Sequence, residues 1–461
     1  MAGPPRDFLS DLFQTLADRS RKLLRRGQSG SAGATLEELA DALLSTRGEA
    51  SGVSLAGTLV ELWPGVGTEG RRNWFLHLAR NLGPDVATLN YAVQSWQADP
   101  SPAHASLLHK AAEPRRQELF RRINLAPGGT ATLVAMREAL LAEVKGHPEL
   151  AAVDADFEYL FNSWFNRGFL VLKLIDWSSS ADVLEKIIRY EAVHEIRGWD
   201  DLKGRLKPID RRCFAFFHPQ MPNEPLVFVE VALTRGIPGQ IAPLIAHDRQ
   251  PIVAAELDTA VFYSITNTQT GLRGISFGNF LIKQVVEELL RELPQLTCFV
   301  TLSPVPGFAA WLAAEQEAPS GRRMDPNLTE LLRQDNWRAG DEARNAAKPL
   351  LEHAAASYLV EAKAANGKPA DPVARFHLNN GAVLERINFE ADLSPKGLRQ
   401  SHGVMVNYRY HLVDIERNHE VYANASQVMM SPEVLKMLGK GDPSMLARVW
   451  PSSLPKERTR K

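Results

Sequence analysis

The sequence predicts an α+β protein with more than one domain, and three observations support this prediction. The chain has 461 residues, which exceeds one ordinary domain, so two or three domains are expected. Residues 1 to about 170 show helical spacing of apolar residues almost throughout. From about Gly168 onward, β-branched and aromatic runs alternate with helical patterns, which is typical of a mixed sheet packed with helices. We therefore expect an all-α helical bundle over residues 1–170, followed by a mixed-sheet α/β domain over residues 171–461.

Composition excludes several classes of function. The chain is 44% hydrophobic and 23% charged, and its net charge is −1, so no global field recruits nucleic acid or a membrane. No apolar run approaches the roughly 20 residues of a membrane span, and the N-terminus lacks the apolar core of a signal peptide. Cys213 and Cys298 lie in apolar runs and are expected to be buried thiols in a reducing compartment. We expect a cytoplasmic protein without a metal site, since no Cys/His spacing suggests zinc.

The first 170 residues read as successive amphipathic helices. One is expected over residues 8–16 behind a Pro-Pro start. Thr35 and Glu38 form a capping box that opens another helix, and two more are expected over about 71–82 and 132–144. Short Gly/Ser/Pro-rich loops between such helices favour an antiparallel bundle. This part carries no catalytic cluster, so we expect it to be a scaffold or an oligomerisation domain.

The second part alternates strands and helices. Strands are expected over residues 213–217, 226–233, 260–265 and 297–302, and helices over 181–190, 277–293 and 342–365.

A glycine-rich loop lies between the third of these strands and the helix after it. It contains Gly271, Gly274 and Gly278, with Arg273 among them. Glycines let the backbone approach a ligand, and N–H groups at a helix start attract phosphate. A helix cap with a tight turn needs the same residues, so both interpretations stay open. The order strand, glycine-rich turn, amphipathic helix, strand resembles the pyrophosphate-binding part of GNAT-type acetyltransferases, with Gly271 and Ser276 at the first and last places of their loop pattern.

Ser303 follows the last predicted strand and begins the sequence Ser-Pro-Val-Pro-Gly. Proline lacks a backbone N–H and has a fixed φ, so two prolines are expected to end sheet pairing at once. Ser303 would then lie at a strand tip, where open α/β sheets tend to bind ligands. In the GNAT arrangement this tip lies near the thioester end of the ligand. The alternative is a serine that only satisfies the backbone of the turn.

His377 lies among apolar residues just before an Asn-Asn-Gly turn signal. A lone histidine in such a place is usually a hydrogen-bonded core residue. Near a serine it becomes a candidate proton carrier, because its ordinary pKa is close to neutral. Tyr410 offers a further polar group. Its alternative role, shared with Tyr408, is packing with the hydroxyl at the surface.

Together these segments resemble the malonyl-CoA decarboxylase family, over roughly residues 160–415. The segments that carry the resemblance are LSPVPGF (302–308), GISFGNFLIKQVVEEL (274–289), ARFHLNNGAVLERIN (374–388), MVNYRY (405–410), RGFLVL (167–172), EAVH (191–194) and WDDLK (199–203). The resemblance implies an N-terminal helical domain, a GNAT-like catalytic domain, and conversion of malonyl-CoA to acetyl-CoA and CO2 without metal or organic cofactor.

The resemblance also implies roles for particular residues. Ser303 and His377 correspond to the catalytic pair of the family, and Tyr410 to a supporting tyrosine. Some family members carry a glutamate where this chain has Ser276, so another group or water must serve if that acid assists catalysis there. The residues expected to bind the phosphates of the substrate are Arg273, Gly274, Ile275, Ser276, Phe277, Gly278 and Asn279.

These roles define an expected mechanism. CO2 leaves a malonyl thioester when the breaking C–C bond stands perpendicular to the thioester plane, and electrons flow into the carbonyl to give an enolate. Ser303 is expected to hydrogen-bond near the carboxylate, while His377 orients the substrate and protonates carbon. No Gly-x-Ser-x-Gly elbow surrounds Ser303, which disfavours a covalent acyl-serine.

Two other functions stay open from sequence: a GNAT-type acyl-CoA N-acyltransferase and a non-catalytic malonyl-CoA-binding regulator. The expected partners are malonyl-CoA as substrate and further copies of the chain in a homo-oligomer, a dimer or a tetramer.

Overall fold

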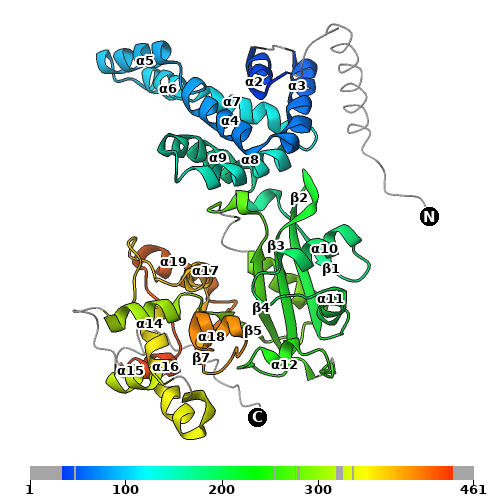
Figure 1. Cartoon of the computed structure of the whole chain (residues 1–461), viewed down its shortest axis with the longest axis vertical. Helices are drawn as coiled ribbons and strands as arrows, with labels where there is room; N and C mark the ends of the chain where they lie inside the picture. The colour runs from blue at the N-terminus through cyan, green and yellow to red at the C-terminus, as the bar shows by residue number, and fades with distance from the viewer. Residues whose placement is uncertain are drawn as a thin grey trace, which may run out of the picture. The chain divides into compact units, whose positions relative to one another are not determined.

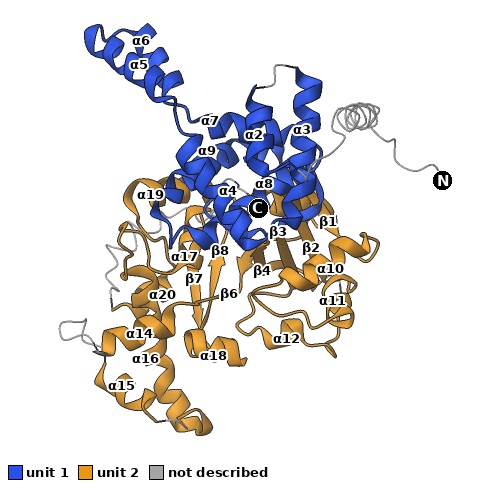
Figure 2. Cartoon of the chain, turned by 45° about the horizontal axis from the view of Figure 1, so that its top comes forward, with its two compact units in different colours: residues 1–171, 217–226, 269–278 blue, residues 172–216, 227–268, 279–461 orange. Residues whose placement is uncertain are grey.

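The computed structural model describes residues 34–45, 48–253, 256–275, 277, 281–317, 325–334 and 337–439. Figure 1 labels the helices and strands, and Figure 2 colours two compact units. The first unit comprises residues 1–171, 217–226 and 269–278, and the second comprises residues 172–216, 227–268 and 279–461. The domain boundary near residue 170 stays a prediction. No helix among the described residues is long and apolar enough to cross a membrane.

The first unit is built mainly of helices, as the sequence predicts. The capping box is confirmed: the Glu38 N–H donates to Thr35 Oγ1 at 3.2 Å, and the Thr35 N–H donates to Glu38 Oε2 at 3.0 Å. The predicted helix over residues 8–16 lies outside the described residues. The helices are α2 (Leu36–Ser45), α3 (Glu49–Leu62), α4 (Thr68–Asn81), α5 (Val86–Ala98), α6 (Pro102–Ala111), α7 (Arg115–Asn124), α8 (Gly129–Glu143) and α9 (Ala151–Trp164), with the 3-10 turns η1 (Trp63–Gly65), η2 (Pro148–Leu150), η3 (Arg167–Phe169) and η5 (Thr270–Leu272).

Within the described residues, an eight-stranded mixed sheet forms the frame of the second part of the chain. Its order is β1-β2-β3-β4-β5-β8-β6, and β7 pairs with β8. β4 is antiparallel to β3 and parallel to β5, whereas β5, β6 and β7 are all antiparallel to β8. The strands are β1 (Val171–Ile175), β2 (Arg211–His218), β3 (Met221–Thr234), β4 (Thr259–Asn267), β5 (Cys298–Thr301), β6 (Ser303–Pro304), β7 (Val383–Asn388) and β8 (Met405–Arg409).

The helices that accompany the sheet agree with the predicted alternation. The helix predicted over 181–190 is found with those bounds. The one predicted over 342–365 ends at Val360, because the chain then folds back through a bridge between Lys363 and Pro369. The helices are α10 (Ala181–Tyr190), α11 (Trp199–Leu206), α12 (Ala242–Ile245), α13 (Leu281–Glu292), α14 (Phe308–Glu317), α15 (Pro326–Leu332), α16 (Asp341–Val360), α17 (Pro372–Asn379), α18 (Pro395–Ser401), α19 (Ile415–Ala425) and α20 (Pro432–Met437), with the 3-10 turn η6 (Trp337–Ala339).

The parallel strands β4 and β5 pair over only part of their length. Thr259–Phe262 of β4 pairs with Cys298–Thr301 of β5, after which β4 continues to Asn267 beside β3 alone. The chain beyond β5 instead follows β8, because Ser303 and Pro304 pair with Val406 and Met405. The expectation that sheet pairing ends at once after Leu302 is therefore wrong. Pro304 can pair here because a short terminal strand does not need its missing N–H.

The apolar core of the sheet explains why these runs are strands. Val261, Val300, Leu302 and Met405 are among the fully buried side chains of one cluster. Cys213 in β2 and Cys298 in β5 are both buried free thiols, as expected for small core residues.

Candidate active site

Three different elements of the second unit position Ser303, His377 and Tyr410. Ser303 opens β6, and Tyr410 lies one residue beyond β8, where its N–H donates to Phe299 O at 2.9 Å. His377 lies in the last turn of α17. That helix begins in a way the sequence favours, since Asp371 accepts the Ala374 N–H at 2.8 Å and Pro372 occupies the first turn.

The three predicted residues form one hydrogen-bonded chain. Tyr410 Oη lies 2.8 Å from His377 Nδ1, and His377 Nε2 lies 3.1 Å from Ser303 Oγ. The chain continues to a residue that the sequence reasoning missed, because Ser303 Oγ donates to Thr301 Oγ1 at 2.9 Å. Thr301 and Ser303 are two residues apart along an extended segment, a spacing that places side chains on one face and could have indicated Thr301.

The hydrogen bonds indicate which atoms of Ser303, His377 and Tyr410 carry the protons between them. Since Ser303 donates its hydroxyl proton to Thr301, its oxygen is left to accept from His377 Nε2–H. His377 Nδ1 must then accept from the Tyr410 hydroxyl. Burial lowers the pKa of His377 to about 3, so the imidazole is neutral. Burial raises the pKa of Tyr410, so its hydroxyl keeps the proton that it donates.

The burial of these side chains tests the alternative given above for the two tyrosines. Ser303 is 5% exposed, His377 3% and Tyr410 3%. Tyr408 is fully buried, and its ring stacks on His377 with centroids 4.7 Å apart. The interpretation of Tyr408 and Tyr410 as packing residues with surface hydroxyls is therefore wrong.

Ser303 and His377 open onto a cavity of about 230 Å³. That volume lies below the roughly 300–1,000 Å³ of sites that hold a whole drug-sized ligand. The cavity is therefore large enough for a small organic group rather than for a whole drug-sized ligand. Its other walls come from β4, β6, α17 and the segment after α10, and they are Val193, Phe262, Tyr263, Ile265, Asn267, Pro304, Pro372, Val373 and Phe376.

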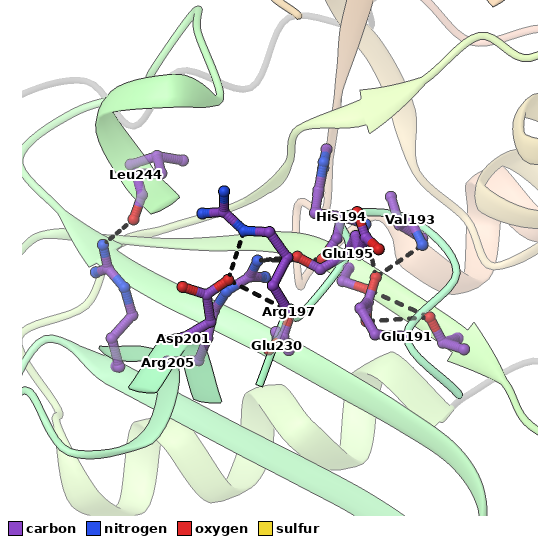
Figure 3. Close-up of polar contacts among 12 residues, drawn as sticks. Glu191, Val193, His194, Glu195, Arg197, Asp201, Arg205, Glu230 and Leu244 are labelled. Atoms are coloured by element: carbon purple, nitrogen blue, oxygen red, sulfur yellow. Dashed lines mark hydrogen bonds and ion pairs between the residues drawn. The ribbon is translucent and has the colours of Figure 1, made fainter. Parts of the chain in front are cut away.

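A cluster of charged side chains, in which Arg205 and Glu230 are buried and Glu191 is half-buried, holds the segment that contributes Val193 to this cavity (Figure 3). Glu191 Oε1 accepts the N–H groups of Val193 and His194, both at 2.7 Å, and its Oε2 accepts the Ser264 hydroxyl at 2.8 Å. Arg205 donates to Glu230 Oε2 at 2.9 Å and to His194 O at 3.1 Å. The cluster thus fixes this wall of the cavity against β4 and β3.

Residues 273–278 of the predicted phosphate-binding loop belong to the first unit, and residue 279 belongs to the second. Ser276, Gly278 and Asn279 lie outside the described residues. Arg273 is exposed, Ile275 is buried, Phe277 is half-buried, and Gly274 has a φ of +85°, a conformation that favours glycine.

Arg137 of α8 organises the backbone of this loop within the first unit. Its Nη1 donates to the carbonyl oxygens of Gly271 at 3.0 Å and Arg273 at 2.8 Å. Its charge is balanced by Asp154 and Glu158, at 2.7 and 2.8 Å. The role of residues 273–279 in binding phosphate stays a prediction.

Close packing explains Gly271 without any ligand, and this explanation can be tested. A Cβ atom added to Gly271 would lie 2.0 Å from Val134 O, so Gly271→Ala is expected to destabilise the protein by about 1–3 kcal/mol. Gly57→Ala in α3 is the matched control, because an added Cβ there meets no atom of the described residues within 4 Å. Calorimetric melting should show a lower Tm for Gly271→Ala and an unchanged or higher Tm for Gly57→Ala. Equal melting of the two variants would contradict the packing argument.

In the part of the chain that the structure describes, no group of three or more His, Cys, Asp or Glu side chains is arranged to hold a metal ion.

Comparison with known proteins identifies the family. A family model described as the malonyl-CoA decarboxylase C-terminal domain matches residues 168–447, and one described as the N-terminal domain matches residues 82–165. The chain belongs to the malonyl-CoA decarboxylase family. It is therefore an enzyme, a carbon–carbon lyase of the carboxy-lyase class.

Relatives and solved structures agree with this assignment. The chain is 35% identical to "Malonyl-CoA decarboxylase, mitochondrial" of Anser anser anser over 79% of each chain. It is 37% identical to the protein of the same name from Mus musculus, over 72% of this chain and 73% of the relative. The crystal structure of malonyl-CoA decarboxylase from Rhodopseudomonas palustris is 54% identical and has a TM-score of 0.84, covering 88% of this chain and all of that chain. The structure from Agrobacterium vitis is 52% identical, with the same TM-score and coverage. The predicted fold class, a helical part followed by a mixed-sheet domain, is confirmed.

Proposed function

We propose that this enzyme converts malonyl-CoA into acetyl-CoA and CO2 in the cavity lined by Ser303 and His377. The observation that carries the proposal is the buried chain from Tyr410 through His377 to Ser303, which ends at that cavity. Membership of the malonyl-CoA decarboxylase family supports malonyl-CoA as the substrate.

Decarboxylation of malonyl-CoA consumes one proton, because the carboxylate leaves as CO2 and carbon gains a hydrogen. In the free enzyme His377 is neutral, since its ring is buried and both its hydrogen-bond partners are neutral hydroxyls. A malonyl carboxylate beside the ring favours the imidazolium. The negative charge passes to the enolate when CO2 leaves, so the ion pair survives the bond cleavage. Nε2–H then protonates carbon, and solvent restores the proton.

Tyr410 and Ser303 assist without changing their covalent state. In the imidazolium both ring nitrogens are donors, so the Tyr410 oxygen changes from donor to acceptor while still holding the ring. Ser303 lines the cavity, and its oxygen holds the donor His377 Nε2–H beside the malonyl group, which positions the proton donor at the reacting carbon. Its hydroxyl proton points to Thr301 rather than to His377, an arrangement that does not activate it as a nucleophile.

Proton donation by His377 predicts how kcat/KM and kcat depend on pH. Because the pKa of free His377 is about 3, only a small fraction of the free enzyme is protonated near neutral pH. Log kcat/KM is expected to fall by about one unit per pH unit between roughly pH 6 and 9. By contrast, kcat should fall only above the higher pKa of the complex. Steady-state kinetics across this range measures both, and a flat kcat/KM would contradict proton donation by His377.

Incubation of EDTA-treated protein with malonyl-CoA alone tests the function itself. Equal amounts of CO2 and acetyl-CoA, formed without an acceptor or added metal, are the expected result. CoA release that depends on an amine acceptor would favour an N-acyltransferase, and tight binding without turnover would favour a regulator. Free CoA together with malonate would instead indicate hydrolysis.

Other roles are proposed on the same family resemblance. We propose that residues 273–279 bind the phosphates of the substrate and that residues 1–170 serve as a scaffold for a homo-oligomer, a dimer or a tetramer. The cytoplasmic location is also a proposal, and the two relatives described above carry the word "mitochondrial" in their names.

A further inference from the structure

We propose that Thr301 is a positioning residue for decarboxylation, because its hydroxyl oxygen fixes the direction in which Ser303 donates its proton. The inference rests on the proposed function, since it concerns how Ser303 and His377 are prepared for it. Thr301 acts through Ser303 and does not itself line the cavity.

The Thr301 hydroxyl is fully buried, and its oxygen accepts two hydrogen bonds. Thr301 is the last residue of β5 and is 0% exposed. Its Oγ1 accepts the Ser303 hydroxyl at 2.9 Å and the Tyr408 N–H at 3.0 Å. A hydroxyl oxygen has two lone pairs, so these two donors occupy both.

Hydrogen bonding and strand pairing fix the position of the Thr301 backbone. Asn407 Nδ2 donates to Thr301 O at 2.7 Å, and Thr301 is in register with Phe262 of β4. The Tyr408 N–H that Thr301 accepts belongs to the residue whose ring stacks on His377. Thr301 therefore contacts the neighbours of His377 on two sides, through the Ser303 hydroxyl and through the Tyr408 backbone.

This acceptor determines which proton arrangement the site adopts. With Thr301 present, the Ser303 proton points away from the imidazole, and His377 keeps its proton on Nε2, on the side of Ser303 and the cavity. Without an acceptor at position 301, the remaining partner of the buried Ser303 hydroxyl is His377 Nε2. That partnership requires the Nδ1–H tautomer, in which Nε2 has no proton to donate and Ser303 resembles the activated serine of a Ser–His pair.

The alternative arrangement supports a different reaction of the same thioester. Ser303 Oγ would form a bond to the thioester carbonyl carbon while its proton moves to His377 Nε2. The C–S bond would break, and the leaving sulfur would take the proton from Nε2. Water would then hydrolyse the malonyl-serine to malonate. Thr301 thus favours decarboxylation over hydrolysis of malonyl-CoA.

The test compares Thr301→Val, which removes the acceptor with little change of shape, with Thr301→Ser, which keeps it. Acetyl-CoA and malonate formed from malonyl-CoA are both quantified. Thr301→Val is expected to lower kcat for decarboxylation by about 10–100-fold and to raise the ratio of malonate to acetyl-CoA. Thr301→Ser is expected to restore the product ratio of the wild type. If Thr301→Val does not fold, Thr301→Ala takes its place in the comparison.

Several outcomes would overturn the inference. An unchanged product ratio in the variant that lacks the hydroxyl would do so, and so would a Thr301→Ser variant that behaves like Thr301→Val. Ser303→Ala separates this inference from the function on which it rests. If Ser303→Ala decarboxylates normally, the proposed site is wrong. If Ser303→Ala is inactive while Thr301→Val is normal, only the role of Thr301 is wrong.

Discussion

Replacement of His377 by asparagine is expected to lower kcat for decarboxylation by about 10²–10⁴-fold, the usual contribution of a positioned acid or base. Asparagine can still donate an N–H toward Ser303, which lies 3.1 Å from the native ring nitrogen. It cannot take up a proton when the malonyl carboxylate enters, so the enolate lacks its acid. Comparison of His377→Asn with the wild type therefore separates the contribution of proton transfer from that of hydrogen bonding to Ser303. Direct assays of CO2 release and of CoA binding measure the two effects separately.

Two further variants make this prediction sharper. Ser303→Ala should also lose most of kcat while still binding CoA, because it removes the hydroxyl that faces the malonyl group. His353→Asn is the matched control, since His353 is an exposed residue of α16 whose Nδ1 lies 2.5 Å from Met437 O. It should keep the activity and pH profile of the wild type. Turnover near that of the wild type in His377→Asn would remove His377 from the mechanism.

The parts of the structure that depend on local sequence could be predicted. The capping box of Thr35 and Glu38 and the bounds of α10 were correct, because hydrogen bonding and apolar spacing within one segment determine them. The sequence also led to Ser303, His377 and Tyr410, since each lies in one of the segments that resemble the family. The structure adds that these side chains form one connected chain.

The parts that depend on distant pairing could not be predicted. The sheet places β8 between β5 and β6, so residues about a hundred positions apart determine where Ser303 and Pro304 pair. Propensity does not specify that partner. Thr301 is a related case: its spacing from Ser303 places the two side chains on one face, but its second donor, the Tyr408 N–H of β8, comes from a distant part of the sequence. The burial of Tyr410 likewise follows from tertiary packing rather than from its neighbours in sequence.

Replacement of Glu230 by leucine is expected to lower the free energy of unfolding at neutral pH by about 1–3 kcal/mol, because it leaves the buried Arg205 without its carboxyl acceptor. Glu230 is 0% exposed, and its Oε2 accepts from Arg205, which is 6% exposed. A glutamate can take up a proton in an apolar site, whereas arginine keeps its charge. Loss of the acceptor is therefore the more costly change. The free energies of unfolding of Glu230→Leu and of the double variant Arg205→Met/Glu230→Leu are measured in urea and compared with that of the wild type. The double variant should recover most of the loss, because apolar side chains of similar volume often replace a buried pair without penalty.

The same residue gives the stability a pH dependence whose sign can be worked out. Burial raises the pKa of Glu230 to about 8, although Arg205 opposes this rise, whereas an ordinary glutamate titrates near 4.5. The folded protein therefore holds this proton more tightly than the unfolded chain. The resulting stabilisation is fully present below pH 4.5 and is lost as the pH rises through about 8. Glu230→Gln does not titrate, so its stability should fall less steeply than that of the wild type between roughly pH 5 and 9. Parallel pH profiles for the two proteins would mean that Glu230 stays ionised beside Arg205 throughout this range. The pair would then be an ordinary buried salt bridge, and the Glu230→Leu variant alone would measure its contribution.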